Sequence, residues 1–453
     1  MKSMLLLVFL ILTTYISCKT KEEWKTRSIY QILTDRFART ADTGACNLGQ
    51  YCGGNIKGIF ENLDYIKGMG FNAIWISPIV ENIEGAYHGY HLTNLYKLNP
   101  HFGSEADLKN LIKVCHLKDI WVMVDVVANH VAPIGTDYSR ITPFNSADHY
   151  HEVCQIVDWN NQNQVENCRL CDLPDLKQEN EWVTQTLYDW INKLVKDYDI
   201  DGIRIDTIME VPKWFWDKFR DYAGVFQIGE AFNGNIDYVS DYQRHLDSVF
   251  NYPLYYKINN GFCSGSMKDL EYYWTTERLK YPEPEVTATF VENHDNARFL
   301  NKCRDNNKFT NAAIFSLLWE GVPVFYYGGE QYYSGGDDPK NREPLWTSGY
   351  KKTQLYKYLG AINKIRVQSK IWNRKIIQRY ASDHFYAFSR DNILACFTNT
   401  NGVNVNLDYH PYKNGDKLCN ALNTKDCITV NNGIINIKMG ALPKVYIKVK
   451  QSS

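Results

Sequence analysis

The stretch WVMVDVVANH (residues 121–130) is a short, almost uninterrupted apolar run that ends in the polar residues Asn129 and His130. Such a run predicts a strand that is buried on both faces, as the strands of a parallel sheet are. Seven further runs of this character alternate with helical segments, and they begin at Ser28, Phe71, Gly202, Val225, Ser248, Ala288 and Val322. Eight strand–helix units predict an α/β fold with a closed (β/α)8 barrel, the TIM barrel, over residues 19–130 and 178–369.

The segments between these runs have the periodicity of amphipathic helices. After Ser104, a candidate N-cap, apolar residues recur at positions 108, 111, 112 and 115, which is the i, i+3, i+4, i+7 spacing of one helical face. Residues 179–198 repeat this pattern. The sixth unit is the exception, because residues 255–281 show little periodicity.

Two segments interrupt the alternation. Residues 131–177 follow the third strand, are mostly polar and far exceed a normal strand–helix loop, so they predict a small excursion domain. Beyond residue 370, short alternating strands such as FYAFSR (385–390) replace the helices. We therefore expect residues 370–453 to form a C-terminal antiparallel β-sandwich.

Residues 1–18 have the features of a secretory signal peptide. Lys2 is followed by an apolar run over residues 4–16 and by the small residues Ser17 and Cys18. The run is shorter than the ~20 residues that span a bilayer, which makes a membrane anchor the weaker alternative. We expect the mature chain to begin near Lys19 and to be secreted, either out of the cell or into a digestive vacuole, with no membrane partner after cleavage.

The charge balance argues against another class of partner. The formal net charge is −1, from 50 basic and 51 acidic residues, and no basic stripe is present, so nucleic acid is not an expected partner. We expect a monomer.

The 12 cysteines fit a secreted chain with local disulfides. The closest pairs in sequence are Cys46–Cys52, Cys154–Cys168 and Cys419–Cys427. Cys115 and Cys396 lie in apolar stretches and are expected to be buried thiols. Cys263 and Cys303 both follow late strands and could pair, and the state of Cys171 stays open.

Ionisable residues crowd the carboxyl ends of the predicted strands, where barrels of this class place their active sites. Asp206, Glu230 and Asp295 end the fourth, fifth and seventh strands. Arg204 and Asp206 are two residues apart on a strand and point to the same side, so the guanidinium would keep Asp206 ionised. Retaining cleavage of a glycosidic bond needs one ionised carboxylate, which attacks the anomeric carbon, and one protonated carboxyl, which Glu230 would supply. Each motif alone could be a structural ion pair, but together they predict a carboxylate active site.

Five motifs in fixed order carry a resemblance to a known family, namely DVVANH (125–130), LPD (173–175), GIRIDTIME (202–210), GEAF (229–232) and FVENHD (290–295). Together they resemble the α-amylase family of glycoside hydrolases. SIYQILTDRFART (28–40) and GGDDPKNRE (335–343) are similar to its fungal type. The resemblance implies a secreted, retaining endo-hydrolase that acts on internal α-1,4-glucosidic bonds of starch, glycogen and maltooligosaccharides.

The resemblance also implies a role for each matching residue. Asp206 matches the nucleophile, Glu230 the acid/base and Asp295 a stabiliser of the transition state. The residues that match groups around the bound sugar are Tyr90, His88, His130, Arg204, His294, Asp338 and Arg342. Tyr90 and His88 could instead only pack their loop.

A calcium ion between the barrel and the excursion is implied as well. Its matching ligands are the side chains of Asn129, Glu166 and Asp175 and the backbone carbonyl of Glu210, which are oxygen donors suited to a hard cation. The chain departs from the fungal pattern at Met209 and Glu210, where that type has Lys-His. The Glu210 carboxylate could reach Glu230 and raise its pKa, or it could point to solvent while only the carbonyl serves the ion.

Two other functions remain as alternatives. An α-glucosidase or a glucan-transferring relative would use the same three carboxylates with different loops. A non-catalytic glucan-binding homologue is expected to have lost at least one of them, and none is replaced here.

Overall fold

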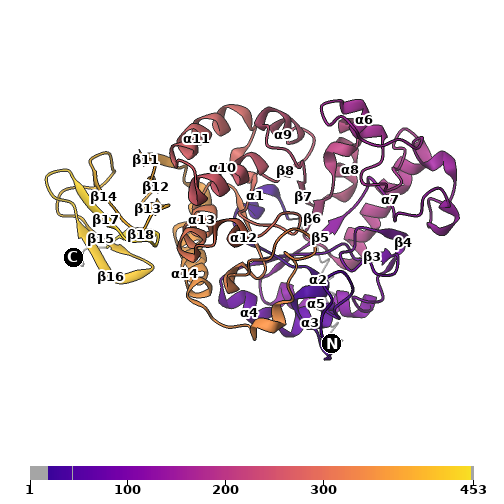
Figure 1. Ribbon diagram of the computed structural model, residues 1–453, viewed down its shortest axis with the longest axis horizontal. Coiled ribbons are helices and arrows are strands. Elements are labelled where there is room, and N and C mark those ends of the chain that lie inside the picture. The colour runs from indigo at the N-terminus through magenta and orange to yellow at the C-terminus, as the bar shows by residue number, and fades with distance from the viewer. Residues whose placement is uncertain (1–18, 43, 450–453) are drawn as a thin grey trace, which may run out of the picture.

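The computed structural model describes residues 19–42 and 44–449. The predicted signal peptide, residues 1–18, lies outside the described residues, as do the last four residues of the chain. Figure 1 shows a large body of strands and helices with smaller sheets, drawn in yellow, at one end. Within the described part of the chain, no helix combines the length and the apolar character needed to cross a membrane.

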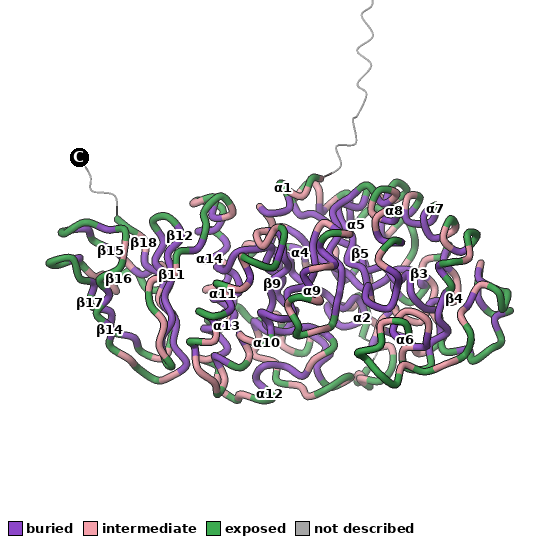
Figure 2. The backbone as a smooth tube through the Cα atoms, turned by 90° about the horizontal axis from the view of Figure 1, so that it is seen from above, coloured by how far each residue is buried: buried purple, intermediate pink, exposed green. Residues whose placement is uncertain are grey.

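Eight parallel strands form the predicted barrel, which confirms the fold class. In chain order they are β1 (Ile29–Gln31), β2 (Ala73–Ile76), β5 (Trp121–Val126), β6 (Gly202–Ile205), β7 (Phe226–Gly229), β8 (Ser248–Val249), β9 (Ala288–Thr289) and β10 (Val322–Tyr326). They pair in the order β8-β7-β6-β5-β2-β1-β10-β9, and a parallel bridge between Phe250 and Ala288 joins β8 to β9. The strands are buried along their length (Figure 2), which is why the apolar runs of the sequence show little alternation.

Helices follow the strands and cover the outside of the barrel. They are α3 (Ile56–Glu61), α4 (Leu63–Gly68), α5 (Glu105–Leu117), α7 (Glu181–Tyr198), α8 (Lys213–Ala223), α9 (Ile236–Tyr242), α10 (Tyr252–Cys263), α11 (Lys268–Lys280), α13 (Asn306–Leu318) and α14 (Gln354–Ser369). Ser104 caps α5 as predicted, because its side chain accepts a hydrogen bond from the Asp107 amide. The sixth unit contains two helices, α10 and α11, so no single helical period can run through residues 255–281.

The chain leaves the barrel after β5 and returns at α7. This excursion holds η1 (Tyr138–Arg140), η2 (Ala147–His149) and α6 (Gln162–Asn167). It is joined to a hairpin that the sequence patterns did not predict, β3 (Val80–Asn82) and β4 (Leu92–Leu98), through a bridge between Asn94 and Thr142. The Ala132 amide also donates to the Leu92 carbonyl (2.9 Å), so the hairpin contacts the excursion where the chain leaves the carboxyl end of β5.

The C-terminal strands form the predicted antiparallel β-sandwich. One sheet has the order β11 (Ile377–Ala381), β12 (Phe385–Arg390), β13 (Ile393–Thr398), β18 (Lys444–Lys448), β15 (Lys417–Asn420) and β16 (Asn423–Thr429). The other pairs β14 (Val403–Leu407) with β17 (Ile435–Met439). Apolar side chains of both sheets, among them Phe385, Leu394 and Ile437, form one buried cluster between them.

The cysteines pair as the sequence predicted. The disulfides Cys46–Cys52, Cys154–Cys168 and Cys419–Cys427 are present, and Cys263 pairs with Cys303. Cys115 and Cys396 are buried thiols, whereas Cys171 is an exposed thiol.

Candidate active site

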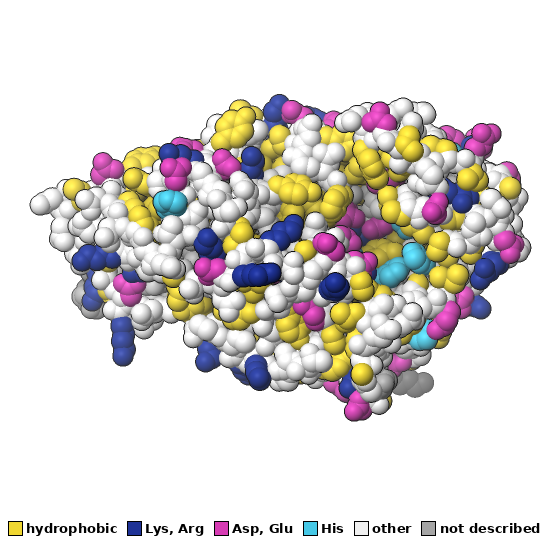
Figure 3. Space-filling view, viewed as in Figure 1, with side chains coloured by type: hydrophobic (Ala, Val, Ile, Leu, Met, Phe, Trp, Pro, Cys, Tyr) yellow, Lys and Arg dark blue, Asp and Glu magenta, His cyan; other side chains and the backbone are white. Residues whose placement is uncertain are grey.

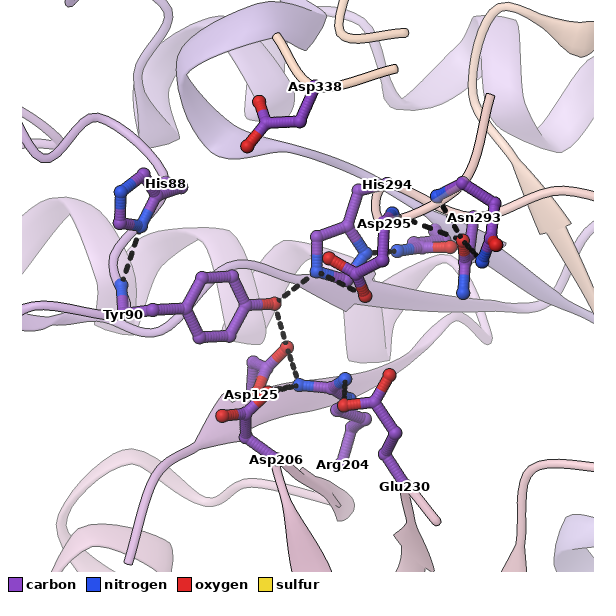
Figure 4. A network of polar contacts seen from close by, with 12 residues as sticks. His88, Tyr90, Asp125, Arg204, Asp206, Glu230, Asn293, His294, Asp295 and Asp338 are labelled. Atoms are coloured by element: carbon purple, nitrogen blue, oxygen red, sulfur yellow. Dashed lines mark hydrogen bonds and ion pairs between the residues drawn. The ribbon is translucent and has the colours of Figure 1, made fainter. Parts of the chain in front are cut away.

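Acidic and histidine side chains line a hollow on the face of the molecule shown in Figure 3. Of the side chains labelled in Figure 4, Asp125, Asp206 and Glu230 come from the carboxyl ends of β5, β6 and β7, and His294 and Asp295 come from the segment after β9. The strand ladders continue past the strands to hold two of these residues in place, because the Asp206 amide donates to the Val126 carbonyl (3.0 Å) and the Glu230 amide to the Ile205 carbonyl (2.9 Å). The predicted strand-end residues therefore meet on one rim.

The guanidinium of Arg204 lies at the centre of three carboxylates. Its Nη1 donates to Asp125 Oδ1 (3.0 Å) and to Asp206 Oδ1 (2.7 Å), and its Nη2 lies 2.5 Å from Glu230 Oε2. Arg204, Asp125, Asp206 and Glu230 are all buried. Since the two terminal nitrogens of a guanidinium are bonded to one carbon, Asp206 and Glu230 are held as close neighbours on a single cation.

The electrostatic surroundings of Glu230 favour its protonated form. Burial raises the pKa of Glu230 well above its ordinary value, and the negative charges of Asp295 and Asp206 raise it further, while Arg204 opposes them. Asp206 shares the Arg204 guanidinium with Glu230 and also accepts a hydrogen bond from the Thr207 hydroxyl (3.2 Å). A carboxyl with a raised pKa therefore lies next to a second carboxyl, as glycoside hydrolysis requires of a proton donor and its partner.

Asp295 lies at the open side of the hollow with a basic neighbour. Arg342 Nη2 is 3.6 Å from Asp295 Oδ1, and Arg342 Nη1 is 3.1 Å from Asp338 Oδ1. The Tyr87 hydroxyl bonds to both Asp338 (3.2 Å) and Arg342 (3.1 Å). The structure thus brings Asp338 and Arg342 to the same rim as Asp295.

Tyr90 and His294 belong to one hydrogen-bond chain. The Tyr90 hydroxyl donates to Asp125 Oδ2 (2.7 Å) and lies 2.7 Å from His294 Nε2, while Gln31 Nε2 lies 2.8 Å from His294 Nδ1. Burial lowers the pKa of His294 well below its ordinary value, so the ring is neutral. Tyr90 does not merely pack its loop, because its hydroxyl is bonded into the carboxylate cluster.

The other two predicted histidines lie next to Tyr90. His88 Nδ1 accepts from the Tyr90 amide (3.1 Å), and burial lowers the pKa of His88 well below its ordinary value. His130 Nε2 lies 3.2 Å from the Tyr90 carbonyl. Burial lowers the pKa of His130 as well, so both imidazoles are neutral hydrogen-bonding groups beside the hollow.

Three of the four predicted calcium ligands also meet. The amide group of Asn129 faces Asp175 Oδ1 at 2.8 Å and the Glu210 carbonyl at 3.1 Å, with His130 Nδ1 at 3.2 Å on its other side. With its nitrogen toward the two oxygens, the amide donates to both. With its oxygen turned toward them, the amide would add a third oxygen beside a carboxylate and a carbonyl, which are ligand types that Ca2+ takes.

Glu166 lies near this trio without joining it. Gln162 Nε2 donates to Glu166 Oε1 (2.7 Å) and to the Met209 carbonyl (3.1 Å), so one glutamine separates Glu166 from the turn η3 (Ile208–Glu210). Among the described residues, no three His, Cys, Asp or Glu side chains form a group that could hold a metal. The candidate set differs from such a group because it consists of one amide, two carboxylates and one carbonyl.

The side chain of Glu210 is buried, which excludes the solvent-facing alternative. Burial raises its pKa to about 8, and the negative charges of Asp206 and Asp175 act in the same direction. The charged neighbours of Glu210 are therefore Asp206 and the candidate calcium ligand Asp175. The negative charges that act most strongly on Glu230 are those of Asp295 and Asp206.

Sequence reasoning assigned no role to several residues of the hollow. Asp125, Tyr87 and Gln31 bond directly to predicted site residues, as described above, and the hydroxyl of Tyr252 bonds to Glu230. Asp125 lies near the carboxyl end of β5, and Gln31 is the last residue of β1. The crowding of ionisable residues at strand ends includes Asp125, whereas Gln31 is uncharged and does not stand out in that pattern.

Comparison with known proteins agrees with this geometry. A family model described as the catalytic domain of α-amylase matches residues 31–399. The α-amylase of Saccharomycopsis fibuligera is 39% identical over 95% of this chain and 93% of its own length, and α-amylase 1 of Schwanniomyces occidentalis is 36% identical over 94% and 90%. The solved structure of an α-amylase from Malbranchea cinnamomea is similar with a TM-score of 0.91 and 38% identity, over 95% of this chain and 97% of that one.

Proposed function

Because this chain belongs to the α-amylase family, we propose that it hydrolyses internal α-1,4-glucosidic bonds of starch, glycogen and maltooligosaccharides with retention of configuration. The observation that carries this proposal is the single buried guanidinium of Arg204 between Asp206 and Glu230. Retaining enzymes hold their two carboxyls roughly 5–5.5 Å apart, and a shared cation favours that short spacing over the wider one of inverting enzymes.

The chemistry would proceed in two displacements. Asp206 attacks the anomeric carbon while Glu230 gives its proton to the leaving oxygen, which breaks the glycosidic bond and forms a glycosyl ester on Asp206. Glu230, now a carboxylate, takes a proton from water, and the resulting hydroxide displaces Asp206 from the sugar. In this proposal Asp295, Arg342 and His294 would hold hydroxyls of the sugar being cleaved.

Product analysis on soluble starch tests this function. An endo-hydrolase releases a mixture of maltose and longer maltooligosaccharides early in the digestion. Glucose as the only product would identify an exo-acting α-glucosidase, and disproportionation of maltooligosaccharides without net hydrolysis would identify a transferase. A non-catalytic homologue would release nothing, and the presence of all three carboxylates around one site argues against it.

We also propose that Ca2+ joins the excursion, residues 131–177, to the barrel. Asn129 follows β5, whereas Asp175 and Glu166 lie in the excursion, so an ion held by them and by the Glu210 carbonyl would connect two parts of the chain. Bound, the ion would supply charge compensation for these carboxylates.

Removing Ca2+ should therefore lower the thermal midpoint and expose the excursion to proteases before the C-terminal sandwich is affected. Differential scanning calorimetry and limited proteolysis, each with and without chelator, measure the two effects. Mg2+ is the control for nonspecific ionic stabilisation. An unchanged melting curve and an unchanged cleavage pattern would rule out the calcium site.

We propose that the mature chain is secreted, and the four disulfides among the residues that the structure describes support an oxidising compartment. We propose that it works as a monomer on an α-glucan substrate.

A further inference from the structure

Tyr252, the first residue of α10, places its hydroxyl on Glu230. The hydroxyl donates to Glu230 Oε1 at 2.9 Å. The ring is 1% exposed and packs against Phe232 (centroids 4.6 Å apart) and Phe290 (5.0 Å). Because the ring is packed in this way, the hydroxyl has little freedom to move away from the carboxyl.

Asn293 fixes the direction in which this hydroxyl points. Its Oδ1 accepts hydrogen bonds from the Asp295 amide (3.1 Å) and from the backbone and side-chain nitrogens of Asn296 (3.1 and 2.9 Å). The amide nitrogen must then be the group that faces Tyr252, and it donates to the hydroxyl at 2.7 Å. Since this bond occupies a lone pair of the hydroxyl oxygen, the hydroxyl proton is left to point at Glu230.

We propose that Tyr252, oriented by Asn293, is a positioning residue that holds the acid/base Glu230 and stabilises its ionised form during turnover. The inference rests on the proposed function, in which Glu230 loses a proton in the first displacement and regains one in the second. The two oxygens of Glu230 then have separate partners, Oε2 the guanidinium of Arg204 and Oε1 the phenol of Tyr252.

The charges that face Glu230 set the direction of the effect. Arg204 and Asp206 face it from the end of β6, Asp295 from the segment after β9, and Tyr252 from α10. Burial raises the pKa of Glu230, Asp295 and Asp206 add to the rise, and the hydrogen bond from Tyr252 lowers it. A donor to the carboxylate favours the ionised form, so removing the hydroxyl must raise the pKa of Glu230.

The test is the pH profile of kcat/KM for Tyr252→Phe, which keeps the ring and removes only the hydroxyl. We expect the basic limb to move upward by about one pH unit and the maximal kcat/KM to fall roughly tenfold. Tyr255→Phe is the matched control, because Tyr255 stacks on the same Phe290 ring while the pKa of its hydroxyl is raised by burial, Tyr256 and Glu292 rather than by Glu230. Its limbs should superimpose on those of the wild type.

A second variant keeps the hydroxyl and strengthens it as a donor. A ring-fluorinated tyrosine at position 252 has a more acidic phenol, so the basic limb should move downward, opposite to the phenylalanine variant. A purely structural role would lower stability or kcat in both variants without moving the limb in opposite directions. Basic limbs that coincide with the wild type in both variants would overturn the inference.

Glu230→Gln, assayed in parallel, separates this inference from the proposed function. If Glu230→Gln is inactive and the limb shifts oppositely in the two Tyr252 variants, both stand. If Glu230→Gln is inactive and the limb stays fixed, the role of Tyr252 is wrong while the function survives. Substantial starch hydrolysis by Glu230→Gln would overturn the acid/base assignment and the inference with it.

Discussion

Replacing Asp206 by Asn is expected to abolish starch hydrolysis, by roughly four orders of magnitude or more in kcat, while the fold and glucan binding remain. An amide is isosteric with the carboxylate but cannot form the glycosyl ester that the first displacement requires. The kcat on starch, measured beside calorimetric binding of a maltooligosaccharide, separates loss of chemistry from loss of binding.

Asp201→Asn is the matched control for this variant. Asp201 is a buried carboxylate just before β6, at the opposite end of the strand from Asp206, and it bonds to His116 (2.7 Å) and to the Val122 amide (2.8 Å). Its replacement should lower the thermal midpoint and leave kcat near the wild-type value. Residual turnover above about 1% in Asp206→Asn would contradict the assignment of Asp206 as the nucleophile.

Arg204→Met is expected to cost stability as well as activity. The guanidinium is the shared partner of Asp125, Asp206 and Glu230, and its removal leaves three buried carboxyls side by side. Breaking a buried ion pair from one side destabilises a protein by about 3–5 kcal/mol. Thermal unfolding followed by circular dichroism measures the loss.

The stability deficit of Arg204→Met should depend on pH in a defined direction. Without the cation, the folded-state pKa values of the three carboxyls rise, so the folded variant binds protons that the unfolded chain, with carboxyl pKa values of about 4, has already released. The deficit should therefore grow as the pH rises from about 4 and be smaller at pH 5 than at pH 8. The stability of Arg204→Lys should lie between those of the wild type and Arg204→Met. The lysine ammonium keeps the positive charge but lacks the planar set of N–H donors that lets a guanidinium bind two carboxylates at once. A deficit that is independent of pH would mean that Arg204 acts through packing alone.

The barrel and most of the site could be predicted because parallel strands bring their carboxyl ends to one rim. A buried strand needs apolar residues on both faces, so runs such as residues 121–130 stand out in the sequence. Once eight such runs are placed in a barrel, Asp206, Glu230 and Asp295 must come together although they lie up to 89 positions apart in the chain, from 206 to 295.

Other features depend on contacts that no periodic pattern records. The hairpin of β3 and β4 is short and partly exposed, so its strands lack an apolar run. Tyr252 bonds to Glu230 from the N-terminus of a helix in the one unit whose periodicity was weak. The burial of Glu210 could not be foreseen either, because it follows from the packing of the turn after β6 and not from the residue type.

In the proposed mechanism Asp206 and Glu230 cleave the α-glucosidic bond by two displacements. The decisive measurement is the anomeric configuration of the first products, followed by proton NMR during digestion of a maltooligosaccharide. Each displacement inverts the anomeric carbon, so two of them must release the α-anomer first, with the β-anomer appearing only as mutarotation proceeds. Initial release of the β-anomer would require a single displacement by water and would contradict Asp206 as the nucleophile.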